Sequence, residues 1–306
     1  EGMPYLKIDR KKRQASFDLS SERENELIEF YERYLSQDLD YFAISPKYDP
    51  ALYKLAEMYK EKPWPELKLI QFVVPGPYSF GFMIKDESGA PALYNNIARD
   101  VMLKMVTMKA KWRQRKVKEL FPGIQTIVTL GDGALGVYSS ASGTGTWDNI
   151  KNDYNQVIEA VEGITCIHCC ANFDWSLLME TNTNVINFDA YQYGDTMALY
   201  PDALKRFLER GGMIAWGIVP TTPGDIENEN PSSLVERLEQ KIQSVVDRGI
   251  DKEMLLESSW ITPSCETTIM TIELAERVFS FTKEVSQRMR EKYGFKRAGK
   301  APQYTK

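Results

Sequence analysis

Strand-like and helix-like segments alternate along most of this chain, and this alternation limits the possible folds more than any other feature. Short runs rich in β-branched and aromatic residues are typical of buried strands. Seven such runs occur, at Tyr41–Ile44, Leu67–Val74, Thr126–Leu130, Ile164–Cys170, Val185–Asp189, Met213–Val219 and Met254–Ile261. Amphipathic patterns predict helices over residues 21–37, 50–60, 95–119, 150–161, 173–180, 200–210, 231–248 and 267–291. Repeated strand–helix–strand order predicts a parallel sheet.

The fold class expected from this order is α/β, as a (β/α)8 TIM barrel formed by a single domain over residues 1–306. Residues 1–20 are expected to be a poorly defined lead-in, and residues 292–306 a tail. A closed barrel needs eight strands, and the segment before residue 20 offers no convincing first strand. We therefore expect this chain to lack the first strand and the natural protein to extend N-terminally. An open sheet with fewer strands is the alternative.

Composition excludes several classes of partner and location. The formal net charge of −5 argues against nucleic acid or an anionic membrane as the main partner. The sequence has no signal peptide and no apolar run of about eighteen residues, so we expect no membrane span. Four cysteines, three of them crowded on one segment, do not resemble a disulfide framework. They favour a cytoplasmic protein with metal-binding or reactive thiols.

His168 is the only histidine among the 306 residues, and three of the four cysteines lie beside it in Ile164-Thr-Cys-Ile-His-Cys-Cys170. Imidazole and thiolate are the ligands that zinc prefers. Because side chains alternate along a strand, Cys166, His168 and Cys170 are predicted to share one face. Cys169 is predicted to pack on the other face, under a helix.

Other candidate ligands also follow strands. The carboxyl ends of barrel strands converge on one mouth, where Val185–Asp189 ends in a carboxylate and the last strand runs into Pro263-Ser-Cys265. The predicted metal ligands are His168, Cys170 and Cys265, with Asp189 as a fourth ligand or a supporting group. Asp189 is equally open to a capping role. The cysteines and the histidine are also open to interpretation as buried core residues.

Two thiolates and one imidazole leave a coordination position for water or substrate, which is typical of a catalytic zinc site rather than a closed structural one. Zinc deprotonates a bound thiol at neutral pH. The chemistry that this donor set favours is activation of a thiol substrate for attack on a methyl or alkyl group.

Several motifs resemble a known family. His168-Cys-Cys170, Asn187-Phe-Asp189 and Pro263-Ser-Cys265 resemble the zinc motifs of cobalamin-independent methionine synthase and of related thiol methyltransferases in the uroporphyrinogen decarboxylase superfamily. Val74-Pro-Gly-Pro-Tyr-Ser-Phe80 resembles that family's strand-three Gly-Pro turn. Leu130–Leu135 and Ala215–Pro220 fall at the family's strands four and seven. The resemblance spans residues 38–291.

The resemblance implies zinc-dependent methyl transfer to a thiol such as homocysteine or coenzyme M, on a TIM barrel, as in methionine biosynthesis. The methyl donor in the family is a methyl-folate or a methylated corrinoid protein. This chain lacks the long N-terminal half of the folate-using enzyme. It therefore resembles the short core enzymes that draw the methyl group from a methyl-corrinoid, and a corrinoid protein is an expected partner.

Two departures from the family affect the substrate. The family's strand-one Gly-Ser-x-Pro turn, which holds the substrate, is absent. Strand four of the family usually ends in Asp-Glu-Pro, with the Asp holding the homocysteine amino group, whereas this chain reads Gly131-Asp132-Gly133. Asp132 is the candidate that takes over this substrate-binding role, and with Asp189 it is a predicted catalytic residue. Otherwise the thiol differs from homocysteine.

Aromatic residues near the predicted mouth are further candidates. Tyr191, Tyr193 and Trp216 are predicted to line the substrate pocket, with packing as the alternative. The predicted function is therefore a zinc-dependent thiol methyltransferase. The alternatives are a uroporphyrinogen decarboxylase-like enzyme, which needs no metal, and a non-catalytic corrinoid- or metal-binding protein.

Overall fold

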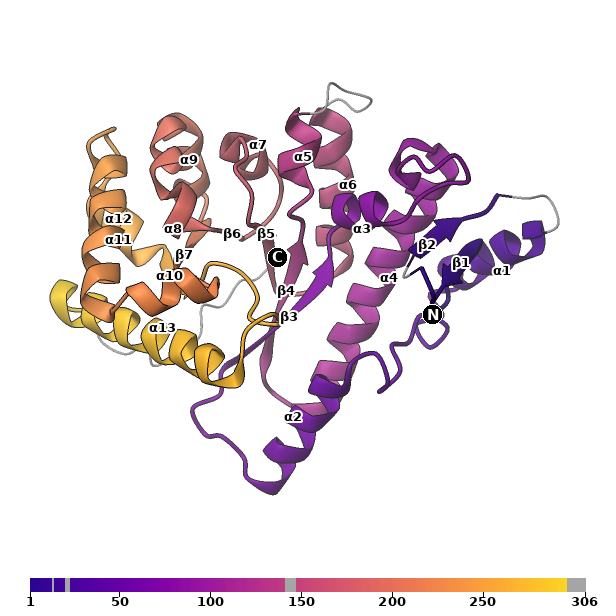
Figure 1. The fold of residues 1–306 in the computed structure, drawn as a ribbon, viewed down its shortest axis with the longest axis horizontal. Coiled ribbons are helices and arrows are strands. Elements are labelled where there is room, and N and C mark those ends of the chain that lie inside the picture. The colour runs from indigo at the N-terminus through magenta and orange to yellow at the C-terminus, as the bar shows by residue number, and fades with distance from the viewer. Residues whose placement is uncertain (13, 20–22, 141–146, 296–306) are drawn as a thin grey trace. The chain divides into compact units, whose positions relative to one another are not determined.

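The computed structural model describes residues 1–12, 14–19, 23–140 and 147–295, and these fall into two compact units (Figure 1). Unit 1 comprises residues 1–134 and 147–165, and unit 2 comprises residues 135–140 and 166–295. Each unit combines parallel strands with helices, which confirms the predicted α/β class. Within the described residues, no helix has the length and the apolar character that a membrane span requires.

Unit 1 carries two kinds of strand pair. The short strands β1 and β2 form an antiparallel hairpin, whereas β3 and β4 pair in parallel from Leu69 opposite Gln125 to Pro75 opposite Gly131. The strands are β1 Leu6–Asp9, β2 Gln14–Phe17, β3 Leu69–Pro75 and β4 Gln125–Gly131. The helices are α1 Glu24–Leu35, α2 Pro50–Glu61, α3 Pro77–Met83, the 3₁₀ turn η2 Ala92–Tyr94, α4 Asn96–Leu120 and α6 Trp147–Ala160.

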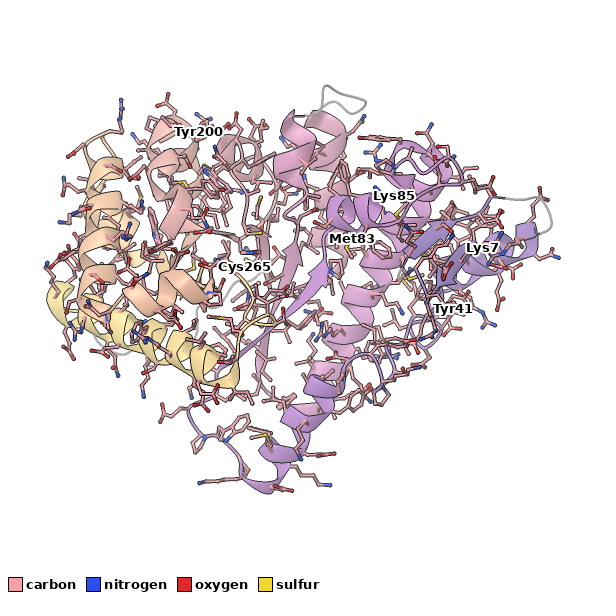
Figure 2. The ribbon with its side chains drawn as sticks, in the orientation of Figure 1. Lys7, Tyr41, Met83, Lys85, Tyr200 and Cys265 are labelled. Atoms are coloured by element: carbon pink, nitrogen blue, oxygen red, sulfur yellow. The ribbon has the colours of Figure 1, made fainter. Side chains whose placement is uncertain are left out.

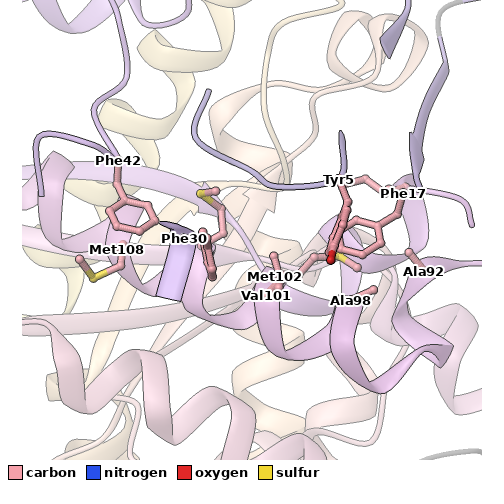
Figure 3. Close-up of a cluster of buried hydrophobic side chains, with 11 residues drawn as sticks. Tyr5, Phe17, Phe30, Phe42, Ala92, Ala98, Val101, Met102 and Met108 are labelled. Carbon is pink, nitrogen blue, oxygen red and sulfur yellow. The ribbon is translucent and has the colours of Figure 1, made fainter. Parts of the chain in front are cut away.

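The long helix α4 organises the core of unit 1. It begins where the Asn95 side chain accepts hydrogen bonds from the backbone N–H groups of Ile97 and Ala98, a normal N-cap. One buried face packs against the hairpin, α1 and the following loop (Figure 3). The buried cluster comprises Tyr5, Phe17, Phe30, Phe42, Ile84, Ala92, Ala98, Val101, Met102, Met105 and Met108. The aromatic pairs Tyr5–Phe17 and Phe30–Phe42 meet edge to face, with ring centroids 5.5 and 5.6 Å apart.

Unit 2 holds four parallel strands in chain order. The register pairs Cys166 with Val185, Val185 with Met213 and Ile214 with Ser259. The strands are β5 Ile164–Cys169, which begins at the unit boundary, β6 Val185–Phe188, β7 Met213–Val219 and β8 Ser259–Pro263. The helices are α5 Leu135–Ser140, α7 Trp175–Met179, α8 Ala190–Tyr193, η3 Gly194–Leu199, α9 Pro201–Glu209, α10 Pro223–Asn228, α11 Pro231–Val246, α12 Lys252–Glu257 and α13 Ile272–Tyr293.

Helices cover the central strands of unit 2, β6 and β7. Every residue of β6 and β7 is buried, as expected for parallel strands covered by crossover helices. Helix α11 contacts β7, α13 contacts β8, and the two helices lie side by side (Figure 1). A capping box at Asn230 starts α11, and Gly294 in the left-handed conformation ends α13.

Most of the predicted elements are confirmed, but three segments differ. Tyr41–Ile44 is not a strand, because turns at Leu39 and Asp40 direct Phe42 into the cluster around α4. The strand expected from Met254 begins instead as helix α12, which Asp251 caps, and only Ser259–Pro263 is extended. The lead-in at residues 1–20 contains the β1–β2 hairpin.

The predicted barrel is shown only in part. The described residues hold two parallel strands in unit 1 and four in unit 2, which is two fewer than a closed (β/α)8 barrel requires. Most of the predicted tail at residues 292–306 lies outside the described residues, apart from the end of α13 and the two residues that follow it. The closed barrel and the single domain stay predictions.

Candidate metal centre

His168, Cys170 and Cys265 come together in unit 2, as the sequence predicts. Their ligand atoms all lie within 4.8 Å of one another, and all three side chains are half-buried. His168 and Cys170 stand at the end of β5, and Cys265 lies in the loop that follows β8 (Figure 2). Cys166 and Cys169 are buried and belong to no such group among the described residues. Strand alternation thus correctly separates Cys169 from its neighbour Cys170.

The donor set and its spacing fit zinc. Tetrahedral coordination with ordinary Zn–S and Zn–N bonds places neighbouring ligand atoms about 3.5–3.8 Å apart. The ligand atoms of this group all lie within 4.8 Å of one another, which is close to that spacing. The Nδ1 atom of His168 lies 2.6 Å from the side-chain oxygen of Asn187, which leaves Nε2 to bind a metal.

The two thiols of the cluster titrate as a pair. A hydrogen bond from Cys265 lowers the pKa of Cys170 to about 7, and the same hydrogen bond, which holds the proton on Cys265, raises the pKa of Cys265 to about 12. Cys170 therefore loses its proton readily near neutral pH, whereas Cys265 does not. A bound cation would offset the repulsion between two thiolate charges, so it would favour the thiolate form of both Cys170 and Cys265.

The loop that carries Cys265 is fixed by contacts that sequence reasoning missed. The Ser264 hydroxyl accepts a hydrogen bond from the Thr221 backbone N–H at 3.2 Å, and the Ser264 N–H donates to the carbonyl oxygen of Val219 at 2.8 Å. Gly217 makes the close approach possible, because a Cβ there would lie 2.4 Å from the Phe188 carbonyl oxygen. The register shift between Gly217 and Val219 accompanies this crossing.

Asp189 lies outside the group of three ligands. Its carboxylate accepts a hydrogen bond from the Gln192 N–H at 2.9 Å and caps helix α8, which is the alternative that the sequence left open. Burial raises the pKa of this carboxyl, while its hydrogen bonds and the nearby His168 act in the opposite direction. Its role as a fourth ligand or a supporting group stays a prediction.

The predicted pocket aromatics are held by other parts of unit 2. The Tyr191 hydroxyl donates to Glu229 at 2.9 Å, and the Arg237 guanidinium lies 4.6 Å from the centre of the Tyr191 ring. The backbone N–H of Tyr193 donates to the Asp189 carbonyl oxygen at 2.9 Å. Trp216 is 0% exposed and packs against Phe188. In the structure, Trp216 is therefore a packing residue. Contacts of Tyr191, Tyr193 and Trp216 with a substrate stay predictions.

Asp132 lies in unit 1, where its carboxylate is 0% exposed. It accepts hydrogen bonds from the backbone N–H groups of Tyr78 and Ser79 at the start of α3 and from the Tyr154 hydroxyl at 2.6 Å. Burial raises its pKa to about 6 against the effect of these hydrogen bonds. Gly76 is required beside it, because a Cβ at this position would lie 2.3 Å from the carboxylate. Asp132 therefore fixes the turn between β3 and α3, and its substrate-binding role stays a prediction.

Unit 1 also contains an apolar cavity of about 320 Å³ that the sequence did not indicate. Its walls include Leu6, Val73 and Met105, and its charged lining groups include Lys109 and Arg113. Lys109 donates to the Ala43 carbonyl oxygen at 3.0 Å, and Arg113 pairs with Asp49. None of the predicted site residues lines this cavity.

Comparison with known proteins supports the fold. No protein-family model and no curated protein matches this chain. Among solved structures, the chain is similar to a B12-independent methionine synthase from Shewanella sp. W3-18-1, which was solved in complex with selenomethionine. The TM-score is 0.51 at 14% sequence identity, and the match covers 79% of this chain and 67% of that chain. At this identity the likeness shows the fold alone, and this is the fold of the family that the motifs resemble.

Proposed function

We propose that this protein is a zinc-dependent methyltransferase that moves a methyl group from a methyl-corrinoid to a thiol such as homocysteine. One observation carries the proposal: His168, Cys170 and Cys265, from two segments almost a hundred residues apart, bring their ligand atoms within 4.8 Å. The similarity in fold to a methionine synthase adds support.

The three side chains leave room for a fourth ligand, and we assign that position, once substrate is bound, to the sulfur of the substrate. Bound zinc would hold a thiol substrate as its thiolate at neutral pH. The substrate sulfur forms the bond to the methyl carbon, and the donor leaves with the electron pair of the broken bond. The role of the protein is to position the thiol and to keep it deprotonated, so that the sulfur is already oriented toward the methyl carbon.

Other residues enter the proposal as contacts of the substrate or the metal. Asp189 is the candidate supporting group, or the fourth ligand in the absence of substrate, because it directly follows β6 and the nearby His168 acts to lower its pKa. Tyr191 and Tyr193 follow it on α8. Asp132 and Trp216 are fully buried, so contact with a substrate requires the packing around them to open. A cytoplasmic location and a corrinoid protein as partner complete the proposal.

Metal analysis and a transfer assay test this function. The protein, purified without chelator, is expected to contain stoichiometric zinc and to transfer the methyl group of methylcobalamin to homocysteine or coenzyme M. Cys170→Ala and Cys265→Ala are expected to lose both zinc and transfer. Cys169→Ala is the matched control, because Cys169 is adjacent to Cys170 and buried outside the group. This variant is expected to keep zinc and activity.

Different outcomes distinguish the alternatives. Absence of zinc from the purified protein, or full zinc in the Cys265→Ala variant, would contradict the metal site. Zinc with no transfer to any thiol would favour a non-catalytic metal-binding protein. Decarboxylation of uroporphyrinogen by metal-depleted protein would favour the decarboxylase alternative.

A further inference from the structure

We propose that Asn187 is a positioning residue that fixes the proton of His168 on Nδ1 and ties together the two segments that supply the metal ligands. The inference rests on the proposed metal centre. Asn187 lies in the middle of β6, opposite His168 in the register of β5 and β6, and is 8% exposed. Its side-chain amide makes three hydrogen bonds, each to a different strand of unit 2.

The orientation of the Asn187 amide follows from its partners. One end lies 3.0 Å from the backbone carbonyl oxygen of Ala215, which is only an acceptor, so this end is the NH₂ group. The same nitrogen lies 2.9 Å from the Thr262 hydroxyl oxygen. The other end is therefore the carbonyl oxygen, which is only an acceptor and lies 2.6 Å from Nδ1 of His168. A hydrogen bond at this distance requires Nδ1 of the imidazole to carry the proton.

This proton position has a direct consequence for metal binding. A neutral imidazole with a proton on Nδ1 has its lone pair on Nε2, and a metal binds the lone pair. Free histidine side chains favour the opposite tautomer, with the proton on Nε2. Asn187 therefore holds His168 in the form that can bind through Nε2 before any metal arrives, as second-shell hydrogen bonds do in metal sites.

The same amide also connects the two ligand-bearing segments. His168 stands on β5, whereas Thr262 lies on β8, three residues before Cys265. The Ala215 carbonyl on β7, between them in strand order, anchors the amide. Rotation of Asn187 would therefore disturb both sides of the metal centre together.

The tautomer can be measured directly because the chain has a single histidine. Metal-free protein labelled with ¹⁵N-histidine gives one imidazole spin system, and long-range ¹H–¹⁵N spectra distinguish a protonated ring nitrogen from an unprotonated one. At mildly alkaline pH, where a free imidazole is neutral, we expect the Nδ1–H form to predominate. Predominance of the Nε2–H form would overturn the inference without any variant.

Three variants extend the test. Asn187→Leu removes all three hydrogen bonds at similar volume, and we expect it to shift the tautomer toward Nε2–H and to weaken zinc affinity by about 10–100-fold. Asn187→Asp keeps an acceptor toward Nδ1, so it should retain the Nδ1–H form and bind zinc more tightly than Asn187→Leu. Gln114→Leu is the matched control, because this buried amide of unit 1 also makes three hydrogen bonds, to Thr126 and to both backbone groups of Glu162.

The control separates positioning from simple destabilisation. Gln114→Leu should lower stability and leave both the tautomer and zinc affinity unchanged. Equal zinc affinity in the wild type and Asn187→Leu, or equal losses in Asn187→Leu and Gln114→Leu, would overturn the positioning role. The tautomer of the metal-free protein does not depend on methyl transfer. A protein that binds zinc with no transfer would therefore defeat the proposed function and leave this inference standing.

Discussion

The clusters around His168 in unit 2 and around Asp132 in unit 1 both form where a parallel strand ends, and both concentrate polar atoms at sites that are at least half-buried. They differ in where their polar atoms are directed. The Asp132 carboxylate is wholly enclosed and accepts hydrogen bonds from two backbone N–H groups and a tyrosine hydroxyl. The half-buried donor atoms of His168, Cys170 and Cys265 are directed at one another.

This difference separates a structural polar cluster from a candidate binding centre. A buried carboxylate satisfied by local backbone donors fixes a turn, and its removal leaves those donors unsatisfied. Three ligand atoms within 4.8 Å of one another would gain most from a cation placed among them, which would replace the proton that the hydrogen bond to Cys170 holds on Cys265 and that raises the pKa of Cys265 to about 12. The contrast is between a carboxylate that stabilises a turn in unit 1 and a proposed metal centre in unit 2.

The largest expected effect is on zinc content, which should differ between variants of His168 and of Asp132. His168→Ala removes the imidazole ligand, so we expect loss of stoichiometric zinc and a fall in thiol methylation of about 10³-fold or more. Asp132→Asn is expected to leave the zinc content unchanged. Metal analysis of both purified variants checks this pair. Loss of zinc in Asp132→Asn, with the fold intact by circular dichroism, would break the contrast.

The second effect concerns stability. Asp132→Ala leaves two backbone N–H groups and the Tyr154 hydroxyl without their acceptor. We expect the free energy of unfolding to fall by about 3–5 kcal/mol. Asp86→Ala is the control, because Asp86 accepts a similar number of hydrogen bonds in a turn near the surface, and its loss should be smaller. Denaturant unfolding of both variants measures the difference, and equal losses would contradict it.

The third effect is a pH dependence at the same carboxylate. Burial raises the pKa of Asp132 from 3.8 to about 6, so the folded protein holds the proton more tightly than the unfolded chain does. The resulting stabilisation is present below pH 3.8 and is lost as the pH rises through about 6. Between these values wild-type protein should lose about 3 kcal/mol relative to Asp132→Asn. Unfolding curves of both proteins across this range test it, and a constant difference would contradict the prediction.

Much of the fold was predictable because burial leaves a clear sequence pattern. The buried and largely apolar runs of β6 and β7 are typical of a covered parallel sheet. The run Tyr41–Ile44 is also apolar, but it is not a strand, and its Phe42 is buried by side-chain packing against α1 and α4. Hydrophobicity predicts that a segment is buried, and it does not tell whether backbone pairing or side-chain packing buries it.

The candidate site was predictable where periodicity alone determines direction. Alternation along β5 places His168 and Cys170 together and directs Cys169 away, as the structure has it. The roles of Asn187 and Ser264 were not predictable, because each depends on hydrogen bonds to strands distant in the sequence. Asp132 was linked to the substrate by its position in a motif, and the hydrogen bonds that surround it could not be read from that motif.

The smallest expected effect concerns the reactivity of the thiols in metal-free protein. The pKa of Cys170 is lowered to about 7 and that of Cys265 is raised to about 12, because the hydrogen bond between them stabilises the Cys170 thiolate and holds the proton on Cys265. Below pH 7 both groups are mainly thiols, and as the pH rises through 7 only Cys170 becomes the nucleophilic thiolate.

Iodoacetamide at neutral pH should therefore alkylate Cys170 at least about a hundredfold faster than Cys265. Peptide mass spectrometry of briefly labelled protein measures the ratio, and the buried Cys166 and Cys169 provide an internal reference for slow reaction. Added zinc should protect Cys170, because the metal engages the same sulfur. Equal labelling of Cys170 and Cys265 without metal would show that the two sulfurs do not share a proton. The clusters of units 1 and 2 would then differ less than the described geometry implies.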